Sequence, residues 1–315
     1  MQTFELLILG SSSATPTSTR NPSSQLLNIA ERYFLIDCGE GTQMQLRKYK
    51  VKFQRINHIL ISHLHGDHFY GLPGLLSSMH LLGRTNDLHL HGPPELKEIM
   101  DVQNKHSQTK LNYAVVFHPT NNNKREIIFE DDILSVETII LNHRISTTGF
   151  LFREKKKQMN IQKEKLKEYK IPVEEIHKIK DGADFITSEG KKIPNNEITD
   201  GPVRLYSYAY CSDTCYDENV IAQIKDVDCL YHETTFLEDM KDRAKQTFHT
   251  TAVQAATVAV KANVKKLLIG HFSARYSDLQ PFLDEAKPVF NNTELAVEGS
   301  KHLINQIEIE NAKVS

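Results

Sequence analysis

The sequence has little cysteine, no long hydrophobic run and almost no net charge, and each absence excludes a class of protein. Four widely spread cysteines in 315 residues do not make a disulfide scaffold or a zinc finger, and they suit reduced thiols in the cytoplasm. The apolar run near the N-terminus is far too short to span a bilayer and lacks the basic start and cleavage site of a secretory signal. Because the formal net charge is −2, any nucleic acid must be held by a local basic patch.

Short apolar segments alternate with segments of helical periodicity through most of the chain. This alternation is typical of an α/β protein in which helices cover β-sheets. The expected strands are 4–9, 25–30, 33–39, 56–63, 87–92, 113–118, 126–129, 134–143, 203–210, 228–234 and 266–272. The expected helices are 41–50, 72–83, 93–106, 217–224 and 251–263.

A highly charged segment, 153–200, interrupts the alternation. Of its 48 residues, 22 are charged, and 12 of these are basic. Charge runs are usually solvated surface. The segment nevertheless contains an apolar face, formed by Ile171, Pro172, Val173, Ile176 and Ile179. It is therefore either a solvated helix and loop or an inserted, ordered arm with a basic stem.

The densest group of chemically active side chains is SHLHGDH at 62–68. Directly after an apolar strand, this stretch places four potential metal ligands within six positions: His63, His65, Asp67 and His68. Functional residues of α/β proteins gather at strand ends. Imidazole nitrogens and carboxylate oxygens are ligands of catalytic zinc, whereas closed structural sites more often use thiolates. One histidine alone is usually structural, but four such side chains favour a metal centre. His63 and His65 can converge on one point, and Asp67 and His68 on a second point nearby.

The remaining cysteines and histidines carry no comparable context. Cys211 and Cys215 are either metal ligands or buried structural thiols, and their spacing favours the second interpretation. Eight other histidines are expected to be structural: His58, His80, His89, His91, His106, His118, His177 and His302.

SHLHGDH resembles the H-x-H-x-D-H signature of the metallo-β-lactamase fold, an αββα sandwich with two metals at the edge between its sheets. Three later positions extend the resemblance, since His143 is similar to the third ligand, Asp213 to the bridging carboxylate and His271 to the last ligand. The resemblance implies two groups of ligands: His63, His65 and His143 for one metal, and Asp67, His68 and His271 for the other, with Asp213 between them. It implies two zinc ions per subunit, or manganese or another divalent metal.

Four further stretches resemble the ribonuclease Z family, whose short form cuts precursor tRNA at its 3′ end. They are SSSATPTSTRNPSS at 11–24, HETTF at 232–236, HTT at 249–251 and HFSARY at 271–276. Because they run through nearly the whole chain, they imply a single domain over 1–315, with 153–200 as an arm that binds tRNA. The chain departs from the family at Ser18, where lysine is usual, at Thr234, where alanine is usual, and at 169–182, which lacks the family's Gly-Pro element.

The resemblance also implies catalytic roles. Asp67 would accept a proton from the attacking water, and His249 would protonate the leaving 3′-oxygen of the ribose. Glu233 would orient the His249 ring, whereas without the paired motifs these two residues would be read as an ordinary surface pair. The residues after His249 predict a capping box made by Thr251 and Gln254, which would fix the direction of that imidazole.

The remaining candidates are positioning and substrate-binding residues. Asp37, in LIDCGEGT, is expected to orient a metal-bound histidine and not to bind metal itself. Ser273 and Arg275 directly follow the last ligand and are expected to reach phosphate oxygens. Arg20 and Asn21 are expected to contact the acceptor end of the tRNA. Each of these four is alternatively a solvated surface residue, and His232 has no assigned role.

The resulting hypothesis is a zinc-dependent endoribonuclease of the cytoplasm that removes the 3′ trailer of precursor tRNA. The tRNA would keep a 3′-hydroxyl and the trailer a 5′-phosphate. The alternative is a hydrolase of small phosphodiesters or lactones with the same fold, but the lysine-rich segment favours RNA because phosphate contacts need clustered cations. The family resemblance further implies a homodimer in which one subunit's arm serves the other subunit's active site, and no membrane partner.

Overall fold

The computed structural model describes residues 3–155, 158–200 and 204–307, and these divide into two compact units. The first unit lies within 1–129, 136–152 and 207–315. The second comprises Glu130–Ser135 and Arg153–Tyr206. Residues 156 and 157 of the predicted arm and residue 203 of a predicted strand lie outside the described residues, as do the ends of the predicted 1–315 domain.

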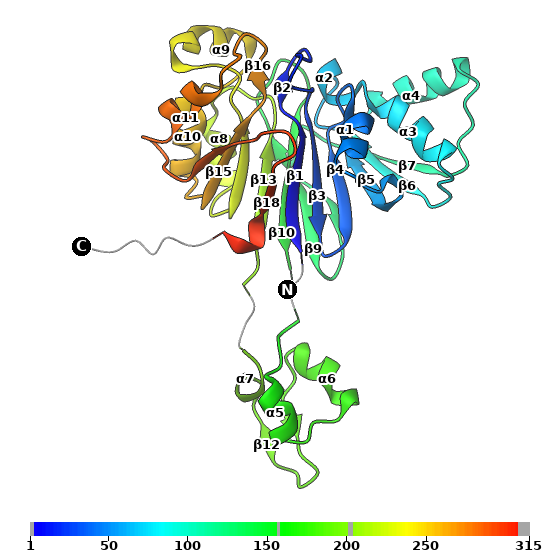
Figure 1. Cartoon of the computed structure of the whole chain (residues 1–315), viewed down its shortest axis with the longest axis vertical. Coiled ribbons are helices and arrows are strands. Elements are labelled where there is room, and N and C mark those ends of the chain that lie inside the picture. The colour runs from blue at the N-terminus through cyan, green and yellow to red at the C-terminus, as the bar shows by residue number, and fades with distance from the viewer. Residues whose placement is uncertain (1–2, 156–157, 201–203, 308–315) are drawn as a thin grey trace. The chain divides into compact units, whose positions relative to one another are not determined.

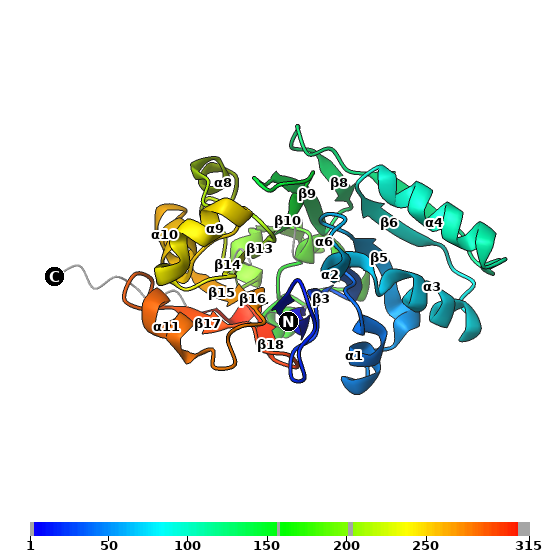
Figure 2. The ribbon, with the colours of Figure 1, turned by 90° about the horizontal axis from the view of Figure 1, so that it is seen from above.

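One sheet of the first unit has seven described strands in the order β18-β1-β3-β4-β5-β6-β7. Their bounds are β1 Phe4–Gly10, β3 Ser24–Ile29, β4 Arg32–Ile36, β5 Ile56–Leu60, β6 Leu88–Gly92, β7 Val115–Pro119 and β18 Lys301–Leu303. Pairing is antiparallel from β18 to β4 and parallel from β4 to β7. Three helices cover the outer face (Figure 2): α1 Thr42–Lys48, α3 Leu72–Leu81 and α4 Glu95–His106. Apolar strand residues such as Ile59 and Leu90 share a buried cluster with Leu75 of α3.

The other sheet also has seven described strands, in the order β17-β15-β14-β13-β10-β9-β8. Their bounds are β8 Ile127–Glu130, β9 Leu134–Ile140, β10 Thr148–Glu154, β13 Ser207–Cys211, β14 Cys229–Glu233, β15 Lys266–Gly270 and β17 Thr293–Leu295. The strands β13, β14, β15 and β17 are parallel. The covering helices are α8 Glu218–Gln223, α10 Ala252–Lys261 and α11 Gln280–Ala286.

The inner faces of the two sheets pack through aromatic side chains. Phe34 of β4 lies edge-on to Phe129 of β8 and to Phe152 of β10, with ring centroids 5.4 and 5.3 Å apart. The layers of this unit are therefore helix, sheet, sheet and helix (Figure 1). The predicted αββα sandwich is confirmed.

Most expected elements lie where the sequence predicts them, and the differences have local causes. The sequence does not predict strand β10. Its first five residues are all buried, so the strand shows no alternation of buried and exposed positions, and it leads directly into the charged segment. The strand expected at 203–210 begins only at Ser207. The predicted capping box starts α10, because Thr251 Oγ1 accepts from the Gln254 N–H while Gln254 Oε1 accepts from the Thr251 N–H.

The first unit also contains short elements. They are β2 Ser12–Ser13, which pairs with β16 Phe272–Ser273, α2 Gly66–Phe69, α9 Lys241–Thr247, and 3₁₀ turns at Phe53–Arg55, Glu238–Met240 and Ile304–Gln306. None of the helices in the described ranges combines the length and apolar character needed to cross a bilayer.

The second unit has its own small apolar core. Its elements are α5 Lys163–Glu168, α6 Val173–Lys180, β11 Phe185–Ile186, β12 Lys192–Ile193 and α7 Asn195–Ile198. The core consists of Ile171, Ile179, Phe185, Ile193 and Ile198. Val173, which the sequence places on the same face, is 79% exposed. The segment is thus an ordered body and not a solvated loop.

Candidate metal centre and active site

All seven predicted metal ligands follow the carboxyl ends of strands. The first four lie on the loop after β5 and on α2, and His143, Asp213 and His271 follow β9, β13 and β15. In open α/β sheets, the crevice outside the carboxyl ends of parallel strands is the usual ligand site. The topology thus gathers residues that are up to 208 positions apart in sequence, from His63 to His271.

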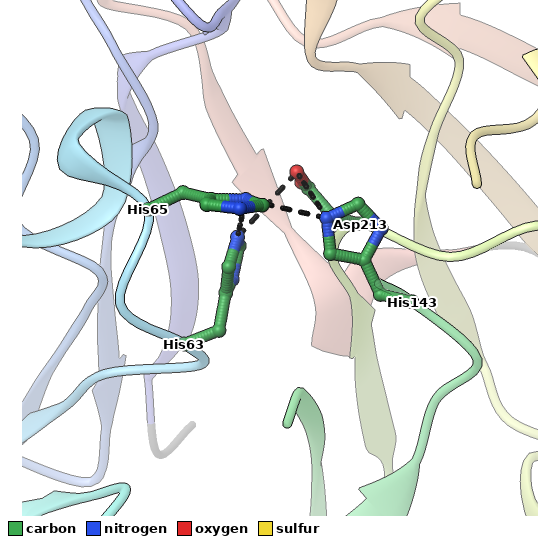
Figure 3. Close-up of side chains that lie close together, drawn as sticks. All are labelled: His63, His65, His143 and Asp213. Carbon is green, nitrogen blue, oxygen red and sulfur yellow. Dashed lines mark hydrogen bonds and ion pairs between the residues drawn. The ribbon is translucent and has the colours of Figure 1, made fainter. Parts of the chain in front are cut away.

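His63, His65, His143 and Asp213 form the first ligand group (Figure 3). The Nδ1 atom of His65 lies 3.1 Å from Nε2 of His63 and 3.3 Å from Nε2 of His143. Asp213 Oδ2 lies 3.5 Å from Nε2 of His63 and 3.8 Å from Nε2 of His143. The four side chains point toward one another, so one cation can contact all of them.

Asp67, His68 and His271 form the second group. Nε2 of His68 lies 3.3 Å from Nε2 of His271, and Asp67 Oδ2 lies 3.4 and 3.3 Å from these two nitrogens. Asp213 Oδ1 lies 3.3 Å from His68 Nε2 and 3.1 Å from His271 Nε2. Since the other Asp213 oxygen faces the first group, this carboxylate lies between the two groups.

Hydrogen bonds on the far side of the imidazoles fix which nitrogen faces the group. The Nδ1–H of His143 donates to the Phe248 carbonyl over 2.9 Å, and that of His68 donates to Asp37 over 2.7 Å. Nδ1 of His63 lies 2.9 Å from Ser62 Oγ. With the proton on Nδ1, Nε2 of each ring keeps a bare lone pair directed inward, as metal ligation requires.

Asp37 is the buried centre of this supporting network. Besides His68, its carboxylate accepts from the Ser62 N–H over 2.7 Å, the Ser62 hydroxyl over 2.9 Å and the Tyr210 hydroxyl over 2.6 Å. Its backbone has a φ of +55°, a conformation that aspartate tolerates better than most residues. The contacts with Ser62 and His68 hold the loop after β5 and α2, the contact with Tyr210 reaches β13 of the other sheet, and Asp37 belongs to neither ligand group.

The charges of the site suit a cation. Burial lowers the pKa of His65 and His143 to about 4, so both imidazoles are neutral at pH 7. Burial alone would favour the neutral form of the Asp213 carboxyl, but His271 and His68 hold its pKa well below its usual value. Burial opposes a charge on His68, but Asp67 and Asp213 raise its pKa well above the usual value, so a divalent metal would displace a proton from this ring. Neutral His65 and His143 beside ionised Asp213 already suit a metal.

Glu233 and His249 meet at the edge of the ligand groups. Nδ1 of His249 donates to Oε1 of Glu233 over 2.9 Å, and a ring nitrogen of His249 lies within 4.8 Å of ligand atoms of Asp213 and His271. Burial disfavours the protonated ring, but the carboxylate of Glu233 raises the pKa of His249 to about 9. A protonated imidazole has no free lone pair, and with Nδ1 held by Glu233 the ring can donate a proton from Nε2.

Thr235 connects this pair to the second ligand group and was missed by the sequence analysis. Its hydroxyl donates to Glu233 Oε2 over 2.9 Å and lies 3.0 Å from Nδ1 of His271. By accepting from that Nδ1–H, Thr235 leaves Nε2 of His271 free toward Asp67. In the sequence, only its position in HETTF, two residues after Glu233, points to this role.

The predicted substrate-binding residues differ in accessibility. Arg20 is buried and donates to the Ser273 carbonyl over 3.2 Å. The Asn21 amide donates to Glu298 over 2.9 Å, a contact that no local pattern predicts. Arg275 is exposed, with its guanidinium 5.1 Å from the centre of the Phe236 ring, and its Nε donates to Ser273 Oγ over 3.1 Å.

One backbone contact joins the N-terminal loop to the ligands. The N–H of Ala14 donates to Asp67 Oδ2 over 2.7 Å. Ala14 has a φ of +61°, and this left-handed conformation turns its N–H toward the carboxylate. The loop that carries Arg20 and Asn21 is thus in direct contact with a predicted metal ligand.

His232 and the cysteines lie outside the ligand groups of the described residues. His232 is buried, and its Nδ1–H donates to the Glu233 carbonyl over 2.8 Å. All four cysteines are unpaired, and Cys38, Cys211 and Cys229 are buried. Burial raises the pKa of the Cys211 thiol, as expected for a structural cysteine.

Comparison with known proteins finds close relatives over the whole chain. The chain is 49% identical to "Ribonuclease Z" of Bacteroides thetaiotaomicron, covering 97% of this chain and 96% of the relative. It is 50% identical to the protein of that name from Phocaeicola vulgatus, covering 98% and 100%. A family model described as "Anti-Pycsar protein Apyc1" matches residues 4–159, just under half of the chain.

Solved structures agree with these relatives. The short form of human tRNase Z has a TM-score of 0.69 and 26% identity, covering 95% of this chain and 99% of that chain. A metallo-β-lactamase fold protein from Bacillus subtilis has a TM-score of 0.67 and 17% identity, covering 95% and 99%. The αββα sandwich of this chain is the metallo-β-lactamase fold.

Proposed function

The chain belongs to the ribonuclease Z family, and from this premise we propose that it is a metal-dependent endonuclease that removes the 3′ trailer of precursor tRNA. The cut leaves a 3′-hydroxyl on the tRNA and a 5′-phosphate on the trailer. The observation that carries the proposal is the pair of ligand groups joined by Asp213, set in a chain 49% identical to a ribonuclease Z. An endonuclease of this kind needs no nucleophilic side chain, because water attacks the phosphodiester.

We propose that the two ligand groups hold two divalent ions per subunit, with zinc as the expected metal. Inward-facing lone pairs on the imidazoles and the two oxygens of Asp213, which face different groups, support two ions. Nitrogen and oxygen ligands without thiolate favour zinc, and manganese fits the same set less closely. The ions would supply Lewis acidity toward the water and toward the non-bridging phosphate oxygens.

Asp67 is proposed as the proton acceptor during attack. Its carboxylate is nine-tenths buried, and Oδ2 faces His68 and His271. The N–H of Ala14 occupies one lone pair of the same oxygen and holds its orientation. A carboxylate fixed in this way can take a proton from water without first reorganising.

His249 is proposed as the general acid for the leaving group. A ribose 3′-oxygen leaves poorly as an alkoxide, so protonation during departure lowers the barrier. The raised pKa of His249, about 9, keeps the ring protonated at neutral pH. Glu233 holds Nδ1, which directs the proton on Nε2 toward the reacting atoms.

Four residues near the N-terminal loop are proposed to serve substrate binding. Arg275 is exposed beside Ser273, and a guanidinium with a hydroxyl suits a phosphate. Arg20 and Asn21 act through the loop that they hold, since their polar groups contact Ser273 and Glu298. Asp37 is a positioning residue for His68.

We propose that the second unit is the arm that binds tRNA. Within the described residues, four exposed lysines of this unit pair with no carboxylate: Lys163, Lys167, Lys170 and Lys191. Cations without an acidic partner are available for phosphates. The arm lacks the family's Gly-Pro element at 169–182, so the proposal rests on these lysines and not on that element.

We further propose a homodimer in the cytoplasm. Two large apolar side chains, Met44 on α1 and Tyr70 directly after α2, are 70% and 67% exposed, and exposed apolar side chains of this size suit a subunit interface. Four unpaired cysteines suit a reducing compartment. If each arm serves the partner's site, mixing an Asp67→Ala protein with a charge-reversed arm variant, Lys163→Glu and Lys167→Glu, should restore cleavage that neither shows alone.

The decisive test is cleavage of a labelled precursor tRNA by the purified protein with added divalent metal. A cut directly after the discriminator nucleotide, with a 3′-hydroxyl and a 5′-phosphate, is the expected result. Rapid hydrolysis of a small phosphodiester or a lactone without cleavage of the precursor would instead favour a small-molecule hydrolase.

A further inference from the structure

A basic surface outside the ligand groups lies between α1 and β5. The 26 residues from Gly41 to Gly66 contain no aspartate or glutamate, although the whole chain has 40 such residues. Five cations fall within nine positions of this stretch: Arg47, Lys48, Lys50, Lys52 and Arg55. We propose that this α1–β5 patch binds the phosphate backbone of the double-stranded body of the tRNA, an inference that rests on the proposed function.

The cations of the patch are accessible and mostly without acidic partners. All five side chains are exposed. Within the described part of the chain, only Arg55 pairs with a carboxylate, that of Glu31. Surface lysines commonly form local ion pairs, and Lys97 does so with Asp101 on α4. A concentration of unpaired positive charge on a protein of net charge −2 attracts a polyanion.

The backbone of the patch is fixed, so its charges are held in place before a ligand binds. The N–H of Val51 donates to the Leu46 carbonyl over 2.8 Å, and the N–H of Lys50 donates to the Arg47 carbonyl over 3.0 Å. These two bonds form a Schellman motif that ends α1. Lys50 holds the left-handed position of this motif with a φ of +57°, where glycine is strongly preferred.

Stabilisation of α1 explains only part of the patch. Arg47 and Lys48 lie in the last turn, where cations interact favourably with the helix dipole. Lys52 and Arg55 lie beyond the end of the helix, and glycine would suit position 50 better than lysine. The helix therefore does not account for three of the five charges.

The shape of the patch favours backbone recognition of a duplex. Lys50, Lys52 and Arg55 line two adjoining grooves on the surface of the first unit. The aromatic rings in the first groove, Tyr33 and Tyr49, are already covered by cations, with the Arg55 guanidinium 4.4 Å and the Lys48 ammonium 5.2 Å from the ring centres. Single-stranded RNA is bound by stacking on open rings, whereas RNA duplexes are held through phosphates and 2′-hydroxyls.

The position of the patch agrees with contact away from the cut. Arg55 directly precedes β5, and the ligands begin after the opposite end of this five-residue strand. At about 3.3 Å per residue, the two ends of the strand are separated by roughly 13 Å. Arg55 is thus about a strand's length from the ligands, too far to touch the scissile phosphate, but a tRNA stem that leads into the site can reach both.

The test replaces four unpaired cations together: Arg47→Gln, Lys48→Gln, Lys50→Gln and Lys52→Gln. The matched control removes four exposed lysines that also lack an acidic partner in the described residues: Lys105→Gln, Lys110→Gln, Lys225→Gln and Lys287→Gln. Binding of mature tRNA, which has no trailer, and of a single-stranded trailer oligonucleotide is measured across a range of salt concentrations. The KM and kcat for precursor cleavage are measured alongside.

The patch variant should bind mature tRNA at least tenfold more weakly than the control variant, with a KM raised by the same factor and kcat unchanged. The slope of log K against log salt should fall by roughly 0.9 for each phosphate that the variant no longer neutralises. Affinity for the oligonucleotide should not change. Equal tRNA affinity and equal salt slope in the two variants would contradict the proposal that the patch binds the tRNA duplex. A loss of affinity confined to the oligonucleotide would contradict it as well. If the wild-type protein cleaves no precursor, the proposed function fails instead, and tRNA binding still reports on the patch.

Discussion

Nδ1 of His249 lies 2.9 Å from Oε1 of Glu233, a carboxylate with no solvent exposure. The same Oε1 accepts from the Thr214 N–H over 3.1 Å, and Oε2 accepts from both the N–H and the hydroxyl of Thr235. Every lone pair of Glu233 thus faces a donor that fixes its position. A carboxylate held in this way holds the imidazole in one orientation and keeps it protonated.

The first prediction concerns His249 as the general acid. His249→Ala should lower the rate of precursor cleavage by about 10²- to 10⁴-fold, the usual range for a positioned acid, with metal content unchanged. A precursor with sulfur in place of the leaving 3′-oxygen should rescue the variant, because sulfur leaves readily without a proton. Single-turnover rates on both substrates measure the effect.

Glu233→Gln is the matched variant for this prediction. It keeps the size of the side chain but removes the charge that raises the pKa of His249. Its defect should be smaller than that of His249→Ala and should be rescued by the same sulfur substrate. Equal defects on oxygen and sulfur substrates would assign His249 to RNA positioning or to structure.

The sequence predicts the first four ligands well because they are local. Four side chains in six residues after an apolar strand already indicate a metal loop. The other three ligands, at 143, 213 and 271, are single residues in ordinary surroundings, and only the family resemblance identifies them. Thr235 and Glu298 have no local sequence pattern that predicts their contacts. The Thr235 hydroxyl joins Glu233 to His271, and the Glu298 carboxylate holds Asn21 from 277 positions away.

The fold shows the same division between local and distant information. The strands were predictable because apolar runs and turn residues mark them, whereas β10 carries no alternation. The buried position of Arg20 and the backbone conformation of Ala14 depend on packing between loops far apart in sequence. Motif matching identifies such residues without showing which way they point.

The second prediction separates chemistry from binding at Asp67. Asp67→Ala removes the carboxylate that faces His68 and His271, so cleavage should be abolished. Precursor affinity should stay nearly unchanged, because exposed cations far from this buried residue supply the phosphate contacts. Rate and dissociation constant are measured on the same precursor. A fall in affinity as large as the fall in rate would show that the RNA-binding surface is misplaced.

The third prediction concerns Asp37 as the support of His68. Asp37→Asn should weaken metal binding by about 10- to 100-fold, the usual effect of removing a partner behind a ligating histidine. Asparagine tolerates the left-handed backbone, so the change acts through the missing charge. Titration of the metal-free protein with zinc, using a competing chelator, measures the affinity.

Asp228→Asn is the control for Asp37→Asn. Asp228 is also buried and accepts from the N–H and hydroxyl of Ser207 over 2.8 and 2.9 Å, at the end of β14 opposite to Glu233. Both variants should lose about 1 to 3 kcal/mol of unfolding free energy, because each leaves buried donors poorly paired. Only Asp37→Asn should lose metal affinity. A similar reduction of affinity in both would mean that general destabilisation causes the effect.

A second cluster of imidazoles lies on the inner face of the first sheet, on β5, β6 and β7. His91 is buried, its ring stacks on His118 with centroids 4.5 Å apart, and its Nε2 lies 3.4 Å from Nδ1 of His58. His58 in turn stacks on His89, with centroids 5.0 Å apart. Nδ1 of His91 has no hydrogen-bond partner among the described residues, so a proton added there would be both buried and unpaired.

The fourth prediction is that this cluster makes the fold sensitive to acid. Burial lowers the pKa of His91 to about 3, from 6.5 in the unfolded chain, so the folded state binds fewer protons between these values. The stability is fully present above pH 6.5 and falls as the pH drops toward 3, by up to about 1.4 kcal/mol per pH unit. His91→Leu removes this titration and should flatten the decline in unfolding free energy between pH 6.5 and pH 4.5, measured by urea unfolding with a chelator present.

His106→Leu controls for the removal of an imidazole, because His106 is exposed at the end of α4. It should keep the wild-type decline in unfolding free energy as the pH falls. Leucine at position 91 places an apolar side chain on the aromatic inner face, so His91→Leu should also remain folded at a lower pH than the wild type. The two variants share the titrating histidines of the metal centre, and the difference between them therefore reports on His91 alone. Parallel curves for His91→Leu and the wild type would mean that the acid sensitivity arises elsewhere.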